Sequence, residues 1–279
     1  MDHLAYCDLL VDEIEACAVE FERADPSSAV PSCPEWTVAD LAKHLGGIHR
    51  WAEALVRDRA AVRKTLGELG GSPDERPTHD DDAATWAAWI RSGGRRLIAT
   101  LREAEPDAPM WAWGADQHIR FWSRRQVHET IVHRWDAALA SLGRLDASAC
   151  VADPVVAVDG VDEFLENLPI AVSFRPAVAK LRGAGSLHLH ATDASGEWMI
   201  RLHEDGFEVA SEHAKGDVAV RAPASALLAV LTGRVTPDDL ECFGDRDLLD
   251  RWLRDSGLAV GAGGARRCHV RRDGYGGLP

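Results

Sequence analysis

The stretch WSRRQVHETIVHRWDAA, residues 122–138, places two histidines and a glutamate on what its surroundings predict to be a long helix. Glu129 and His133 are four residues apart, so on a helix they lie about 40° apart around the axis, one turn above the other. A carboxylate and an imidazole that reach one point are a natural pair of ligands for Zn²⁺ or a similar divalent ion. His128 lies about 140° from His133, so the stretch is not the HExxH motif of metalloproteases, which is one residue shorter.

A catalytic zinc usually has three protein ligands, so a third must come from elsewhere in the chain. The predicted helix TVADLAKHLGGIHRWAEALVRDRAAV, residues 37–62, carries His44 beside the apolar positions Leu41 and Leu45. His49 lies about 140° further around the axis, so we expect at most one of the two histidines to face inward with these leucines. His44 matches that face better. Ligands from two facing helices can converge in the core of a bundle.

Simpler interpretations of these residues stay open at this point. A Glu–His pair at this spacing is often a solvated surface contact. Asp136 could orient the imidazole of His133, but pairing with Arg134 or with solvent is the interpretation that we favour. His188 and His190 alternate with leucines, so we interpret them as the polar face of a strand rather than as ligands.

The chain changes character near residue 150. Apolar positions at spacings of three and four predict four helices joined by loops, and therefore a helical bundle. These helices lie within residues 2–23, 37–62, around 86–101 and up to about 142. The second half alternates apolar and polar residues in strand-like segments and ends in two helices, which indicates an α+β unit. We therefore expect two domains, residues 1–148 and 149–279.

Two details of the second predicted helix have a structural meaning of their own. Thr37 followed by Asp40 resembles a capping box, with Asp in place of the usual Glu. Gly46 and Gly47 lie in the middle of the helix, at a cost of roughly 1 kcal/mol each relative to Ala. Such a pair indicates the close approach of a neighbouring helix.

Composition excludes several classes of partner. The chain has 279 residues, with 31 Lys and Arg against 45 Asp and Glu, and a formal net charge of −14. This balance works against binding to nucleic acid or to an anionic membrane surface. No apolar run approaches the ~20 residues of a membrane span, and the N-terminus lacks the basic start of a signal peptide. The six cysteines form no CxxC pair and suggest no disulfide framework, so we expect a cytoplasmic protein.

Two segments together resemble a known family. VPSCPEWTVADLAKHLGGIHRWA, residues 30–52, is similar to the N-terminal motif of the mycothiol-dependent maleylpyruvate isomerase family, and VHETIVHRWDA, residues 127–137, to its second motif. The resemblance implies a DinB-like four-helix bundle followed by a smaller sterol-carrier-like α+β domain. It also implies that His44, Glu129 and His133 hold a zinc.

The resemblance further implies an activity. A low-molecular-weight thiol, mycothiol, would be activated at the open zinc position and would add to a small electrophile, giving cis–trans isomerisation or S-transfer. An arginine of the second domain would hold an anionic substrate, and Arg234 in LTGRVTPDDL is the candidate. The alternatives are a metal-dependent hydrolase and a non-catalytic protein that binds divalent metal or serves a stress response.

The Trp-rich loop at 111–113 could be an interface, a pocket wall or core.

Overall fold

The computed structural model describes residues 1–70, 76–171, 176–183 and 185–256, which divide into two compact units. The described part of the first unit runs from Met1 to Arg144, and the second unit begins at Leu145. The domain boundary expected at 148/149 follows shortly after this division and stays a prediction.

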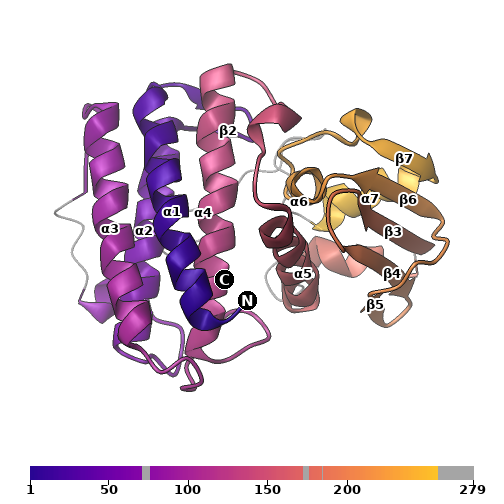
Figure 1. Ribbon diagram of the computed structural model, residues 1–279, viewed down its shortest axis with the longest axis horizontal. Coiled ribbons are helices and arrows are strands. Elements are labelled where there is room, and N and C mark those ends of the chain that lie inside the picture. The colour runs from indigo at the N-terminus through magenta and orange to yellow at the C-terminus, as the bar shows by residue number, and fades with distance from the viewer. Residues whose placement is uncertain (71–75, 172–175, 184, 257–279) are drawn as a thin grey trace. The chain divides into compact units, whose positions relative to one another are not determined.

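The first unit is built on four helices that lie side by side, as Figure 1 shows. Both α1 and α2 contact α3 and α4, so the four helices share one core, and the predicted helical bundle is confirmed. The helices are α1 (His3–Arg23), α2 (Val38–Arg57), α3 (Ala83–Glu103) and α4 (Ile119–Leu142), with a short 3-10 helix, η1 (Gly67–Leu69), between α2 and α3.

Local sequence explains where these helices begin and end. The Asp2 and Asp82 carboxylates accept hydrogen bonds from the first turns of α1 and α3. The capping box predicted at Thr37 and Asp40 is present, with both reciprocal hydrogen bonds formed. Gly143 ends α4 in the left-handed conformation, φ 68°, which a glycine adopts without strain.

The proline-rich segment between α1 and α2 forms more structure than the sequence suggested. It contains an antiparallel pair of short strands, β1 (Ala29–Val30) and β2 (Cys33–Thr37), where the sequence predicted only a break. β2 leads directly into α2, and β1 contacts α4. The hairpin therefore lies against both helices that carry the predicted ligands.

The second unit contains one five-stranded sheet with the strand order β5-β4-β3-β6-β7. β3 and β6 are parallel, and the other neighbouring strands are antiparallel. The prediction of an α+β fold, with a helical first part and a smaller mixed second part, is confirmed; β7 is a strand that the sequence analysis missed. The strands are β3 (Gly185–Ala191), β4 (Glu197–His203), β5 (Gly206–Ala210), β6 (Val218–Ala222) and β7 (Glu241–Gly244).

Helices cover the sheet and close the second unit. α5 and α6 contact each other, α5 contacts β5, and α6 contacts β3 and β6. The indole of Trp198 on β4 donates a hydrogen bond of 2.6 Å to Asp162 on α5, which identifies the face of the sheet that this helix covers. The helices are α5 (Pro154–Ala171), α6 (Ala224–Leu231) and α7 (Arg246–Ser256), with short 3-10 helices η2 (Ala147–Ala149), η3 (Pro176–Leu181) and η4 (Pro237–Asp239).

Within the described ranges, no helix is both long enough and apolar enough to cross a membrane.

The glycine pair in α2 marks a close helix contact, as predicted. A Cβ atom added at Gly46 would lie 2.2 Å from Cζ3 of Trp89 on α3, far inside van der Waals contact. The indole also packs against Arg50, whose guanidinium carbon lies 3.9 Å from the ring centroid. Arg50 also donates hydrogen bonds to the carbonyl oxygens of Gly46 and Trp89. The ring therefore has little room to move away.

We predict that Gly46→Ala lowers the free energy of unfolding by about 1–2 kcal/mol, because the cost of overpacking against a fixed indole exceeds the gain in helix propensity. Denaturant unfolding of the full chain measures this. The matched control is Gly67→Ala, since a Cβ at Gly67 meets no atom within 4 Å. Equal or greater stability of Gly46→Ala would contradict the close contact.

Candidate metal centre

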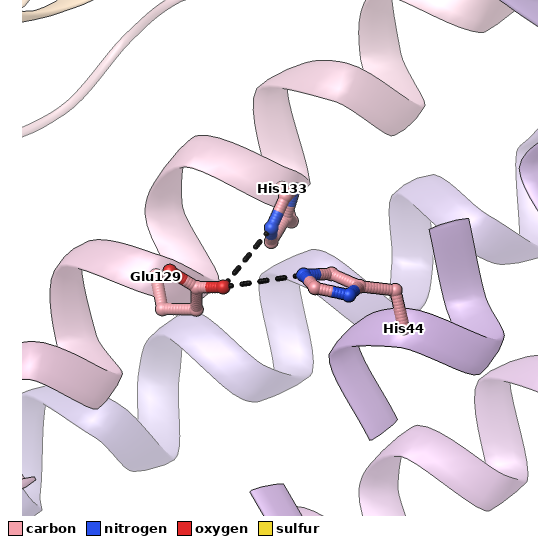
Figure 2. A group of neighbouring side chains, drawn as sticks. All are labelled: His44, Glu129 and His133. Carbon is pink, nitrogen blue, oxygen red and sulfur yellow. Dashed lines mark hydrogen bonds and ion pairs between the residues drawn. The ribbon is translucent and has the colours of Figure 1, made fainter. Parts of the chain in front are cut away.

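Three side chains from two helices meet at one carboxylate oxygen in the first unit. Oε1 of Glu129 lies 3.2 Å from Nε2 of His133, one turn further along α4, and 3.5 Å from Nε2 of His44 on α2. Figure 2 shows both imidazoles directed at this oxygen. The His44 and His133 ring centroids are 5.0 Å apart and the rings are nearly perpendicular. The structure thus brings together the three residues that the sequence predicted as ligands.

The second oxygen of Glu129 has a different partner. Arg125, one turn before Glu129, donates a hydrogen bond of 2.9 Å to Oε2. The guanidinium carbon of Arg125 also lies 5.8 Å from the ring centroid of Trp113. Arg125 therefore binds one oxygen of Glu129, while the other oxygen, Oε1, faces the two imidazoles.

Asp136 fixes the orientation of His133. Its carboxylate is fully buried, and Oδ2 lies 2.8 Å from Nδ1 of His133. The hydroxyl of Ser32, between β1 and β2, donates to the other oxygen. With the proton of His133 held at Nδ1, Nε2 is left to face Glu129. Our preferred interpretation of Asp136, a pairing with Arg134 or solvent, is wrong.

The error has a physical reason in the packing of the hairpin. β1 lies against α4, and Ser32 and Asp136 are both buried where the hairpin meets this helix. Arg134 instead donates to Glu13 on α1, at 2.9 Å. Spacing along α4 does not contain this information, because the hairpin comes from a segment about one hundred residues earlier.

Burial and hydrogen bonding set the charges of the three residues. Burial lowers the pKa of His44, which favours its neutral form. Burial alone would raise the pKa of Glu129, but hydrogen bonds from His133 and His44 hold that pKa well below its ordinary value. Burial alone would also lower the pKa of His133, but hydrogen bonds with Asp136 and Glu129 raise it to about 9. At neutral pH the metal-free cluster thus has two carboxylates balanced by Arg125 and a protonated His133.

The other two histidines of these helices behave differently from His44 and His133. His49 is fully buried, and its Nε2 lies 3.0 Å from the hydroxyl of Thr130 on α4. The expectation that at most one of His44 and His49 faces inward is therefore wrong, because both side chains meet α4, His44 at Glu129 and His49 at Thr130. His128 is also buried and influences the pKa of Glu13 on α1.

The Trp-rich loop packs against the bundle. The Trp111 ring centroid lies 5.9 Å from that of Trp51 on α2 and 6.1 Å from that of Trp122 on α4. Trp113 packs against Phe121 with the ring centroids 5.4 Å apart. These contacts place the loop against the first unit, and Trp113 lies near Arg125.

Arg234 belongs to the second unit, just after α6. Its side chain is 5% exposed, and its guanidinium donates a hydrogen bond to the carbonyl oxygen of Thr232. Burial of an arginine is unusual and indicates a specific environment. Its role in holding an anionic substrate stays a prediction.

Comparison with known proteins identifies the class of protein to which this fold and cluster belong. Residues 7–138 match the sequence profile described as the Mycothiol maleylpyruvate isomerase N-terminal domain, and residues 155–251 match that of the MDMPI C-terminal domain. The chain therefore belongs to the mycothiol-dependent maleylpyruvate isomerase family, as its sequence motifs predicted. No curated protein sequence matches the chain.

Solved structures agree on the fold. Two crystal structures of the mycothiol-dependent maleylpyruvate isomerase, one of them of a point mutant, are similar to this chain with TM-scores of 0.56 and 0.57. In each case the match covers 87% of this chain and 93% of the other, at 13% sequence identity. At this identity the likeness concerns the fold alone.

The donor atoms of the cluster fit a divalent ion. Ligand atoms of His44, Glu129 and His133 all lie within 4.8 Å of one another. Two imidazole nitrogens and a carboxylate oxygen are a ligand set that Zn²⁺ takes in catalytic sites, with an open position left over. Asp136 adds the outer hydrogen bond that metal-binding histidines usually make.

We predict that Asp136→Asn lowers the pKa of His133 from about 9 in metal-stripped protein, because the substitution removes the negative charge beside Nδ1. An NMR pH titration of the histidine signals measures this shift. Asp116→Asn is the matched control, since it alters a more exposed His–Asp contact, with His118, in the same unit. An unchanged titration of His133 in Asp136→Asn would contradict the assigned hydrogen bond.

Proposed function

We propose that this protein is a metal-dependent enzyme that activates mycothiol for addition to a small electrophilic substrate, with cis–trans isomerisation or S-transfer as the outcome. The observation that carries the proposal is the meeting of His44 and His133 at Oε1 of Glu129 in a chain of this family. In this proposal the three residues bind Zn²⁺ or another divalent ion. When bound there, the ion supplies positive charge that lowers the pKa of a thiol towards neutral pH.

The chain's own residues prepare the site for an anionic nucleophile. His44 is held neutral by burial, and Asp136 directs Nε2 of His133 towards Glu129, so both imidazoles present a nitrogen to the same point. Arg125 stabilises Glu129 through Oε2 without occupying Oε1. A charge-balanced cluster that exchanges the His133 proton for a divalent cation gains net positive charge, which favours a thiolate over a thiol.

The surroundings of His44 define one wall of the proposed site. The ring of Trp36 on β2 lies against the imidazole, with the centroids 5.0 Å apart. An indole beside the ligands limits the directions from which a thiol and an electrophile can approach. Isomerisation then requires that the adduct be held while the bond rotates, whereas S-transfer requires only that the adduct be released.

Two further functions share the same ligands. A metal-dependent hydrolase would use the ion to activate water rather than a thiol. A non-catalytic protein that binds divalent metal would keep the ion and turn nothing over. Assays with mycothiol and maleylpyruvate, with mycothiol and an activated aryl halide, and with amide substrates in the absence of thiol separate these functions.

We predict that His44→Ala and His133→Ala each lower both the metal content and the thiol-dependent turnover, the latter on the order of 10³-fold. The reason is that a catalytic metal contributes several kcal/mol to stabilising the transition state. Elemental analysis and steady-state kinetics on the purified full chain measure the two effects. The control is His79→Ala, since His79 is an exposed histidine beside Asp40 in the same unit. Full metal content and turnover in His133→Ala would overturn the proposal.

We predict that Arg234→Lys raises KM for an anionic substrate by about tenfold or more, because an ammonium does not reproduce the two-pronged hydrogen bonding of a guanidinium. Metal content should remain unchanged. Arg254→Lys, an exposed arginine of the same unit, is the control. An unchanged KM in an Arg234→Lys protein that melts at the normal temperature would leave Arg234 a structural residue only.

A further inference from the structure

A second cluster of histidines lies on the sheet of the second unit. His188 and His190 alternate along β3, so their side chains share the face opposite to the buried Leu187 and Leu189. This much follows the interpretation of the pair as one face of a strand. Glu197, the first residue of β4, is paired directly with His190 across the two strands. His213 comes from the connection between β5 and β6.

Three imidazoles lie around one carboxylate in this cluster, whereas two do so in the bundle. Nδ1 of His190 and Nδ1 of His213 each lie 2.6 Å from Oε1 of Glu197, and Nε2 of His188 lies 4.0 Å from the same oxygen. The His188 and His213 ring centroids are 5.2 Å apart and the rings are nearly perpendicular. Three imidazoles, two from β3 and one from the β5–β6 connection, thus lie around one oxygen of Glu197.

A buried nitrogen of His188 lacks a hydrogen-bond partner among the described residues. His188 is 6% exposed, and the nitrogen in question is Nε2. A buried polar group left in this state costs about 1–3 kcal/mol. The distance of 4.0 Å to Oε1 is too long for a hydrogen bond but close to the separation of about 3.4 Å between two ligands of one tetrahedral Zn²⁺. An ion between these atoms would satisfy both.

The charges around His188 and Glu197 agree with this geometry. Burial lowers the pKa of His188 against the opposing effect of Glu197, and the neighbouring His213 and His190 lower it further. Hydrogen bonds from His213 and His190 lower the pKa of Glu197, which keeps the carboxylate ionised. Oε1 has two imidazoles at hydrogen-bond distance and lies 4.0 Å from the third, that of His188. A cation between His188, Glu197 and His213 would give Nε2 of His188 the partner that it lacks among the described residues.

We propose that His188, Glu197 and His213 form a second divalent-metal site that takes an ion of the Zn²⁺ class, with His190 positioning Glu197. The ligand atoms of the three residues all lie within 4.8 Å of one another. Two imidazoles and one carboxylate leave open positions for water, as in the first cluster. Because the side chain of His213 is 78% exposed, the ion exchanges with solution. It fastens the β5–β6 connection to the face of the sheet.

The test is the number of Zn²⁺ ions that the chelator-stripped full chain binds, measured by equilibrium dialysis and elemental analysis. We expect two ions per chain for the unmodified protein and one for His213→Ala, whose exposed side chain can be removed without disturbing the core. His133→Ala should also bind one ion, and the double variant none. His190→Ala should weaken the second site about 10–100-fold, as the loss of an outer hydrogen-bond partner does.

His203→Ala is the matched control. His203 is an exposed histidine on β4, and its Nε2 lies 3.5 Å from Oε2 of Glu208. We expect the His203→Ala protein to bind both ions. Zn²⁺ binding should also raise the melting temperature of His133→Ala protein but not that of the double variant. Unchanged stoichiometry in His213→Ala overturns the second site. One ion in the unmodified chain that is lost in His213→Ala and kept in His133→Ala supports the second site and counts against the first, so the two proposals fail separately.

Discussion

The first unit depends on how it accommodates the partly buried carboxylate of Glu129. Glu129 lies between α2 and α4, and an ionised group in such a place is costly unless it is paired and hydrogen-bonded. Here Oε1 faces His44 and His133, and Oε2 accepts from Arg125. Because these partners come from both helices, the carboxylate links α2 to α4. The contact between the two helices and the chemistry of the cluster therefore involve the same residues.

The carboxylate also explains why the hairpin matters. His133 reaches Glu129 in a useful orientation only because Asp136 holds its other nitrogen, and Asp136 is shielded from water where the β1–β2 hairpin lies against α4. Trp36, on the same hairpin, packs against His44. A short segment with three prolines thus contacts both candidate histidines. Through Ser32 and Asp136 it orients His133, and through Trp36 it packs against His44. Its proline content limits the conformations of the unfolded chain and so favours a fixed shape.

Much of the fold and the convergence of the three candidate ligands could be predicted from the sequence, because the relevant information is local. Glu129 and His133 share a face through helix geometry alone, and His44 follows from its position beside Leu45. Asp136 and His49 could not be assigned in the same way. Asp136 meets Ser32 of the hairpin and His49 meets Thr130 on α4, and the apolar stripes of the two helices predict neither contact. A helix covered on several sides has no polar face to predict.

The histidines around Glu197 show the same limit of sequence analysis. Alternation along β3 correctly places His188 and His190 on one face, but the number of histidines around Glu197 depends on where the β5–β6 connection brings His213. Both clusters use two imidazoles and a carboxylate, yet their physical settings differ. The proposed bundle site lies between helices and has a buried outer partner, so we expect a preorganised site that exchanges an ion slowly. The proposed sheet site has one residue on an exposed connection, so ordering that connection would offset part of the binding energy, and we expect a weaker and faster site.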